Sequence, residues 1–245
     1  MLKVYTDKKI CKPKAIIFDT DNTLYHYKPA HKAAMEAVLD KSKKLLGVGS
    51  DEFIKIFDFS RNEIKSQLGK TASSHSRLLY FQRTIESLGM GTRIFLALDF
   101  EQTYWREFLV NARLYPGVRE LLQQLKSTEI KTANITDLTA QIQFRKMVYF
   151  GLDEYFDFVV TSEEAGCDKP DIRPFTLALK KLKVSPEDVW MIGDSISCDV
   201  VGAKEANLVS LQMKNYDVKS KLNKKILPDV RFESYMDLIN FFDEL

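Results

Sequence analysis

Lys14-Ala-Ile-Ile-Phe-Asp-Thr-Asp-Asn-Thr-Leu24 decides the fold, because an apolar run leads directly into two carboxylates spaced one residue apart. Residues 15–18 are apolar and rich in β-branched and aromatic side chains, which is typical of a strand buried on both faces of an α/β sheet. Open parallel sheets bind ligands just beyond the carboxyl ends of their strands. Asp19 and Asp21 stand at that position, so the stretch predicts a ligand site at the end of a buried strand.

The two carboxylates allow several interpretations. In an extended chain their side chains would point to the same side, about 6 to 7 Å apart. They could then share one divalent cation, or divide the roles of nucleophile and proton donor between them. Asp and Asn also favour turns, so the segment could be no more than a polar loop. The stretch alone does not decide between these interpretations.

Length and composition exclude several classes of protein. The 245 residues exceed one average domain and fit a core domain that carries a large insertion. A hydrophobic fraction of 45% and a charged fraction of 29% are ordinary for a soluble globular protein. The net charge of +2 favours neither a nucleic acid nor an anionic membrane as partner. Three cysteines without metal-like spacing, and no apolar run of about 18 residues, predict a cytoplasmic protein with reduced thiols.

The middle of the chain has a different pattern from its flanks. From about residue 30 to 112, apolar residues recur at helical spacing, and glycine-containing segments divide this block into four predicted helices. From Tyr115 onward, helices alternate with short apolar strands. Strands are predicted at residues 130–135, 158–161, 189–192 and 208–212, and helices at about 118–127, 139–149, 174–182, 197–206 and 234–242. The lysine-rich stretch at about 214–228 is predicted to be a surface connection.

This alternation predicts an α/β fold in three layers, with a parallel sheet, right-handed crossovers and the strand at 15–18 in the same sheet. Residues 1–25 and 113–245 would form this core. Residues 26–112 would form a four-helix bundle inserted after the first strand. Because the insertion follows the strand end that carries the carboxylates, we expect it to act as a lid.

Three further strand ends carry polar residues suited to the same site. Thr136 and Asp137 follow one strand, where a hydroxyl and backbone N–H groups suit a phosphate oxygen, although either residue could simply cap the next helix. Lys169, in Asp-Lys-Pro, could neutralise an anionic nucleophile and a phosphate. Asp194 follows a third strand as a ligand for a hard cation, with Asp199 as its support. Four strand ends with acid, hydroxyl or lysine favour one site over coincidence.

In this order, the four segments resemble the four motifs of the haloacid dehalogenase-like (HAD) hydrolase superfamily. Phe-Asp19-Thr-Asp21-Asn-Thr-Leu resembles the first motif, Thr136 the second, Lys169 the third and Gly-Asp194 with the later Asp the fourth. The resemblance covers essentially the whole chain and is closest to the group with a helical cap in the first insertion position. It implies a Rossmann-like core and a four-helix cap.

The resemblance also implies roles for the residues that match its motifs. Asp19 would be the nucleophile that becomes phosphorylated. Asp21 would act as general acid toward the leaving group and then as general base toward water. Thr136 and Lys169 would hold the phosphoryl group. An acyl phosphate that water can cleave divides one difficult step into two easier ones.

A Mg²⁺ ion is implied by the same resemblance. Asp19, the backbone carbonyl of Asp21 and Asp194 would bind it, with Asp199 in a supporting position. One position departs from the pattern, because many relatives have Asn where this sequence has Asp137. A second anion there would weaken phosphate binding unless its side chain turns away, which leaves Thr136 as the stronger candidate of the pair.

These motifs predict a Mg²⁺-dependent phosphatase for a small phosphorylated metabolite, either a nucleoside monophosphate or a sugar phosphate. Asp21 argues against a dehalogenase, because displacing a halide needs no proton on the leaving group. A phosphomutase would use the same motifs and stays an alternative. A non-enzymatic phospho-signalling module is a second alternative. We expect a monomer or homodimer, and the roles of Tyr25, His26 and Tyr27 stay open.

Overall fold

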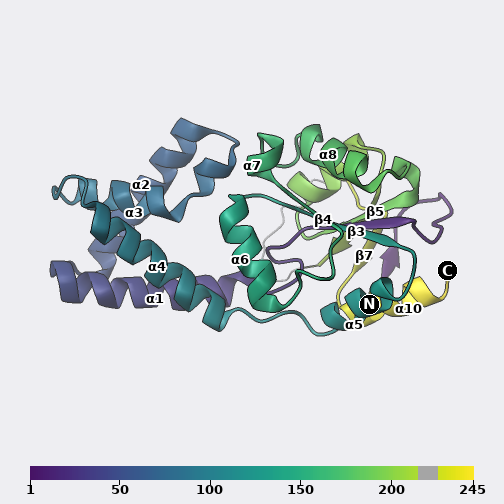
Figure 1. Cartoon of the computed structure of the whole chain (residues 1–245), viewed down its shortest axis with the longest axis horizontal. Coiled ribbons are helices and arrows are strands. Elements are labelled where there is room, and N and C mark those ends of the chain that lie inside the picture. The colour runs from purple at the N-terminus through teal and green to yellow at the C-terminus, as the bar shows by residue number, and fades with distance from the viewer. Residues whose placement is uncertain (215–225) are drawn as a thin grey trace. The chain divides into compact units, whose positions relative to one another are not determined.

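The chain divides into two compact units in the computed structural model (Figure 1). One unit comprises Met1–His26 and Arg113–Leu245, and the other comprises Tyr27–Ala112. The structure describes residues 1–214 and 226–245. Most of the stretch predicted to be a surface connection, at about 214–228, therefore lies outside the described residues.

The first unit is built on one seven-stranded sheet in the order β1-β7-β6-β5-β2-β3-β4. Its strands are β1 (Lys3–Val4), β2 (Ala15–Phe18), β3 (Lys131–Thr136), β4 (Phe158–Thr161), β5 (Val189–Gly193), β6 (Val209–Met213) and β7 (Val230–Phe232). Every neighbouring pair is parallel except β1 and β7, which are antiparallel. The predicted α/β sheet is confirmed, and every strand that the sequence predicted lies in its parallel part. Strands β1 and β7, which form the antiparallel pair, were not predicted, because strands of two and three residues are too short to produce a sequence pattern.

Helices cover both faces of this sheet, as predicted. They are α5 (Val118–Lys126), α6 (Ala140–Phe150), α7 (Ser162–Ala165), α8 (Ile172–Leu182), α9 (Val201–Glu205) and α10 (Tyr235–Asp243). Ala15 and Ile17 of β2 share a buried cluster with Phe175 of α8. On the other face, Trp190 of β5 packs against Phe242 of α10, with ring centroids 6.1 Å apart. Figure 1 shows α8 on one side of the strands and α5 with α10 on the other.

One predicted helix, at 197–206, is interrupted. The chain first makes a π-helical turn, Ile196–Val200, and only then enters α9. The backbone N–H groups of Asp199 and Val200 both donate to the carbonyl of Ser195, at 2.9 and 3.1 Å. The π turn and α9 are five residues each, too short for a change of helical spacing to be recognised from the apolar residues, so the sequence did not reveal the turn.

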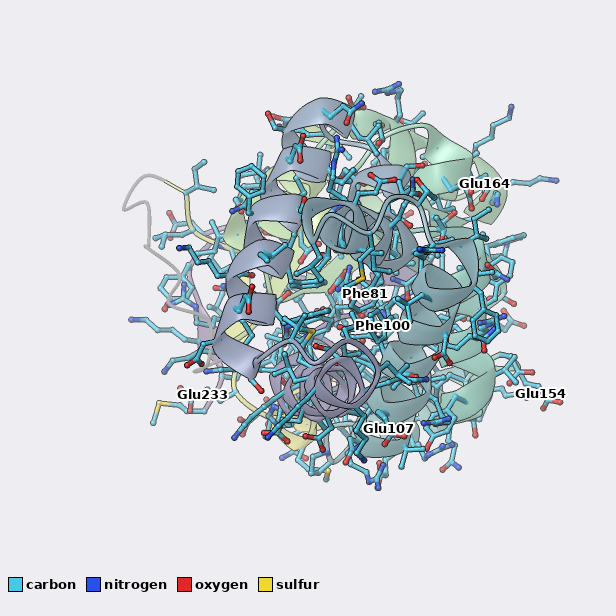
Figure 2. The ribbon with its side chains drawn as sticks, turned by 90° about the vertical axis from the view of Figure 1, so that its left-hand side faces the viewer. Phe81, Phe100, Glu107, Glu154, Glu164 and Glu233 are labelled. Atoms are coloured by element: carbon cyan, nitrogen blue, oxygen red, sulfur yellow. The ribbon has the colours of Figure 1, made fainter. Side chains whose placement is uncertain are left out.

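The second unit, all of whose residues are described, consists of helices as predicted. They are α1 (Tyr27–Leu46), α2 (Ser50–Leu68), α3 (Arg77–Ser87) and α4 (Ile94–Asn111), with a short 3₁₀ turn at Ala72–His75. Aromatic side chains fill the interior between the helices. Phe81 and Phe100 are fully buried with ring centroids 5.9 Å apart, and Figure 2 shows both inside the unit. That this unit acts as a lid stays a prediction.

No helix within residues 1–214 and 226–245 combines the length and the apolar character that crossing a bilayer requires.

We expect Gly202→Ala to destabilise the first unit. A Cβ atom at Gly202 of α9 would lie 2.2 Å from Cε2 of Phe175, inside the core between helix and sheet. Such overpacking costs about 1 to 3 kcal/mol of unfolding free energy, which lowers the melting temperature by several degrees. Gly49→Ala is the control, because nothing lies within 4 Å of the added atom. Thermal unfolding with equal melting temperatures for the two variants would contradict this packing.

Candidate active site

Strand register brings the predicted site residues to one edge of the sheet. Phe18, the last residue of β2, pairs with Asn134 of β3 on one side and with Ile192 of β5 on the other. The next residue, Asp19, donates its backbone N–H to the carbonyl of Ile192 at 2.8 Å. The carboxyl ends of three neighbouring strands are therefore nearly level, and β2 lies between β5 and β3 inside the sheet.

After Phe18 the chain does not stay extended but curls into a tight turn. The Leu24 N–H donates to the carbonyl of Thr20 at 2.9 Å, and Asn22 adopts the left-handed conformation that Asn tolerates, with φ of 63°. The hydroxyl of Thr23 donates to Oδ2 of Asp19 at 2.7 Å. The segment therefore forms the polar turn that the sequence allowed as one interpretation, and the geometry of an extended chain does not apply beyond Phe18.

Lys169 is the cation at the centre of the site. Its side chain is only 2% exposed. Its Nζ donates to Oδ1 of Asp19 at 2.6 Å, to Oδ1 of Asp199 at 2.7 Å and to the Ile135 carbonyl at 3.2 Å. Burial lowers the pKa of Lys169, but the negative charges of Asp19 and Asp199 outweigh this and hold the pKa well above its usual value. The lysine predicted to neutralise a nucleophile does contact that carboxylate.

Three carboxylates gather beside this ammonium. One oxygen from each of Asp19, Asp194 and Asp199 lies within 4.8 Å of the others. Burial, together with the negative charges of Asp19 and Asp199, raises the pKa of Asp194 to about 9. Burial likewise raises the pKa of Asp19 to about 6, although Lys169 opposes this. Three oxygen donors whose charges destabilise one another are the chemistry of a hard-cation site, so the residues present fit a bound divalent ion.

The π turn after β5 places Asp199 in this group. Its Oδ2 accepts the backbone N–H of Ser195 at 2.9 Å, and its side chain is 2% exposed. Gly193 makes the approach possible, because a Cβ atom there would lie 2.4 Å from Cγ of Asp199. Its other oxygen accepts from Lys169, and the supporting role of Asp199 at a metal ion stays a prediction.

Thr136 and Asp137 occupy the end of β3, and neither begins the following helix. Thr136 is the buried last residue of the strand, and α6 has Thr139 as its N-cap. Oδ1 of Asp137 accepts the backbone N–H of Lys169 at 3.0 Å. The Asp137 carboxylate thus ties the two loops together. Burial raises its pKa, with Lys169 opposing the rise.

Asp21 has partners that the sequence did not predict. Nζ of Lys146 lies 2.7 Å from its Oδ1 and 3.1 Å from its Oδ2, and the hydroxyl of Tyr25 donates to Oδ1 at 2.5 Å. Its carboxylate is not part of the three-acid group found among the described residues. Lys146 could have been noticed from its place in α6, on the stripe that includes Ile142 and Phe150 and is otherwise apolar or amide. A lysine on a buried helical stripe needs a partner.

This fold and site define a class of protein, namely an α/β protein whose sheet edge holds a buried lysine among carboxylates, suited to phosphoryl chemistry with a divalent cation. A family model named haloacid dehalogenase-like hydrolase matches residues 13–207. The chain therefore belongs to the haloacid dehalogenase-like hydrolase family, as its motifs predicted.

Similar proteins agree with this assignment. The ribulose-1,5-bisphosphate 5-phosphatase of Halopiger xanaduensis is 36% identical over 79% of this chain and 82% of its own length. The glyceraldehyde 3-phosphate phosphatase of Methanopyrus kandleri is 27% identical over 95% of this chain and 98% of its own length. The crystal structure of a HAD phosphatase from Thermococcus onnurineus has a similar fold, with a TM-score of 0.71 and 24% identity, over 93% of this chain and 96% of that one.

We expect Asp137→Asn to be folded and active. The amide oxygen can still accept the Lys169 N–H, and losing one negative charge should strengthen binding of inorganic phosphate by roughly two- to tenfold. Asp137→Ala is the comparison, because it leaves that buried N–H without its acceptor and should lower the melting temperature. Phosphate inhibition constants and thermal unfolding measure both effects. Weaker phosphate binding by Asp137→Asn would show that the charge itself is required.

We expect binding of a divalent cation to release protons. A carboxyl with a pKa of about 9 holds its proton at neutral pH, so a cation that binds Asp194 must displace it. Affinity for Mg²⁺ should therefore rise by roughly tenfold per pH unit up to about pH 9, and more steeply below about pH 6, where Asp19 also becomes protonated. Calorimetric titration in two buffers of different ionisation enthalpy counts the protons. An affinity that does not change with pH would contradict the site.

Proposed function

We propose that this chain is a Mg²⁺-dependent phosphatase that hydrolyses a small phosphorylated metabolite through a phosphoenzyme on Asp19. The observation that carries the proposal is the contact of the Asp19 carboxylate with the buried ammonium of Lys169, at 2.6 Å. An anionic nucleophile approaches an anionic phosphate only where positive charge offsets the repulsion. The buried lysine supplies part of this positive charge at the end of β2. A cation held by the group of carboxylates would supply the rest.

The residues of the site divide the work in this proposal. Thr23 and Lys169 each donate to a different oxygen of Asp19, which fixes the orientation of its carboxylate. Asp19 and Asp194, with Asp199 in support, would hold Mg²⁺, and the ion would neutralise charge on the phosphate. The backbone carbonyl of Asp21 would complete the ligands, while its side chain would move protons. The hydroxyl of Thr136 would donate a hydrogen bond to a phosphate oxygen.

The substrate class follows from the relatives. Their names give ribulose-1,5-bisphosphate, glyceraldehyde 3-phosphate and, in Nitrosococcus oceani, phosphoglycolate as the substrates of phosphatases 27 to 36% identical to this chain. All three compounds are small phosphate esters of carbohydrates or of acids derived from them. They favour a sugar phosphate over a nucleoside monophosphate as the substrate proposed here.

A phosphate-release assay tests the proposal. The panel holds p-nitrophenyl phosphate, the three compounds above and a nucleoside monophosphate, each with and without Mg²⁺. We expect Asp19→Asn to lower kcat by roughly 10³-fold or more, because the amide is a poor nucleophile. Asp188→Asn is the matched control, since it alters an exposed ion pair with Lys14 before the start of the strands. Equal rates for wild type and Asp19→Asn would contradict the proposal.

The same panel separates the alternatives. A phosphomutase would give an isomerised sugar phosphate with little free phosphate. A phospho-signalling module would leave all the esters intact.

A further inference from the structure

Lys146 is a buried cation that the proposed mechanism does not use. Its side chain, in the middle of α6, is 1% exposed, whereas the side chain of its partner Asp21 is 33% exposed. Burying an ammonium is costly unless an anion and hydrogen bonds compensate it. Lys146 meets this need with both oxygens of Asp21, at 2.7 and 3.1 Å. The two partners are therefore unequally buried, because the cation lies inside the core whereas the carboxylate still reaches solvent.

Tyr25 is a second donor to the same carboxylate. Its hydroxyl donates to Oδ1 of Asp21 at 2.5 Å, the oxygen that is also nearest to Lys146. The Tyr25 ring is fully buried, 5.0 Å from the ring of Phe150 on α6 and 5.8 Å from Nζ of Lys146. Both donors are thus buried in the core. Two donors that converge on one oxygen restrict rotation of the carboxyl group.

We propose that Lys146, together with Tyr25, is a positioning residue that orients the Asp21 carboxyl for proton transfer to the leaving group. The inference rests on the proposed function, since it concerns the same reaction. In the first step a bond forms between an Asp19 oxygen and phosphorus. For this step Asp21 takes up a proton from solvent on Oδ2, the oxygen that Tyr25 does not contact. The bond from phosphorus to the leaving oxygen breaks, its electron pair stays on that oxygen, and this proton moves there.

A purely structural role for Lys146 would have different consequences. A buried ion pair contributes little net stability and can often be replaced by apolar side chains. Loss of stability would also affect all substrates by the same factor. Loss of orientation affects only reactions that need the proton, because misplacement of a catalytic group by about 1 Å can cost 10²-fold. The dependence of rate on the leaving group therefore separates the two roles.

The test compares two esters with Lys146→Met. Glyceraldehyde 3-phosphate has an alkoxide leaving group that needs a proton, whereas p-nitrophenyl phosphate has one that departs without it. We expect kcat/KM to fall by about 10- to 100-fold for the first and by less than about threefold for the second. This parameter covers the steps up to the release of the leaving group, so slower hydrolysis of the phosphoenzyme does not disturb it. The inhibition constant of inorganic phosphate should stay within about twofold of wild type.

Three further variants make the result specific. Tyr25→Phe removes one donor but keeps the ring, and should shift the ratio of the two esters in the same direction by a smaller factor. Lys146→Arg restores a cationic donor and should recover part of the loss. Lys181→Met is the matched control, since it removes a partly exposed lysine paired with Glu164 at 2.6 Å, and should leave the ratio unchanged.

An equal fall for both esters, or no fall for either, would overturn the positioning role. If Lys146→Met does not fold, Tyr25→Phe decides by the same ratio. Failure of the proposed function looks different, because then the wild type hydrolyses neither ester or Asp19→Asn stays as active as the wild type.

Discussion

The ammonium of Lys169 lies beside three carboxyl groups, whose combined negative charge exceeds its single positive charge. The edge of the sheet is arranged around this excess of negative charge. Asp19 comes from the end of β2, Asp194 from the end of β5 and Asp199 from the π turn that follows. Burial and mutual repulsion raise the pKa values of Asp19 and Asp194, so both carboxyl groups hold their protons to a higher pH than usual. A site in this state is ready to exchange protons for a metal ion and to receive a phosphate beside the lysine.

The sequence was sufficient for the architecture of this edge because parallel strands end together. Once apolar strands alternate with helices, the residues after each strand must meet, whatever the details of packing. What it could not predict depends on single residues or on tertiary contacts. Strands β1 and β7 are too short to show a pattern, and the π turn at Ile196–Val200 is too short for its wider spacing to be recognised from the apolar residues. The turn after Phe18 was one of the interpretations that the sequence left open, and only the structure decides in its favour.

Lys146 shows the same limit at the site itself. Its contact with Asp21 joins residues 125 positions apart, and nothing near either residue predicts the other. Only its position on the buried stripe of α6 gave a signal. The contact changes how Asp21 is understood, because the carboxyl proposed to move protons accepts hydrogen bonds from a buried lysine and a buried tyrosine. Asp137 is a similar case, since its carboxylate binds the Lys169 backbone, which explains how an acid is tolerated where many relatives have Asn.

The central claim is that the phosphoryl group passes through Asp19 before it reaches water. The stereochemical course at phosphorus tests this most directly, with a thiophosphate ester made chiral at phosphorus by oxygen isotopes and with isotopically labelled water as the acceptor. Two successive in-line displacements, first by Asp19 and then by the acceptor, each invert the configuration, so the account predicts net retention. Net inversion would show that the acceptor attacks the substrate directly, and would contradict a phosphoenzyme on Asp19.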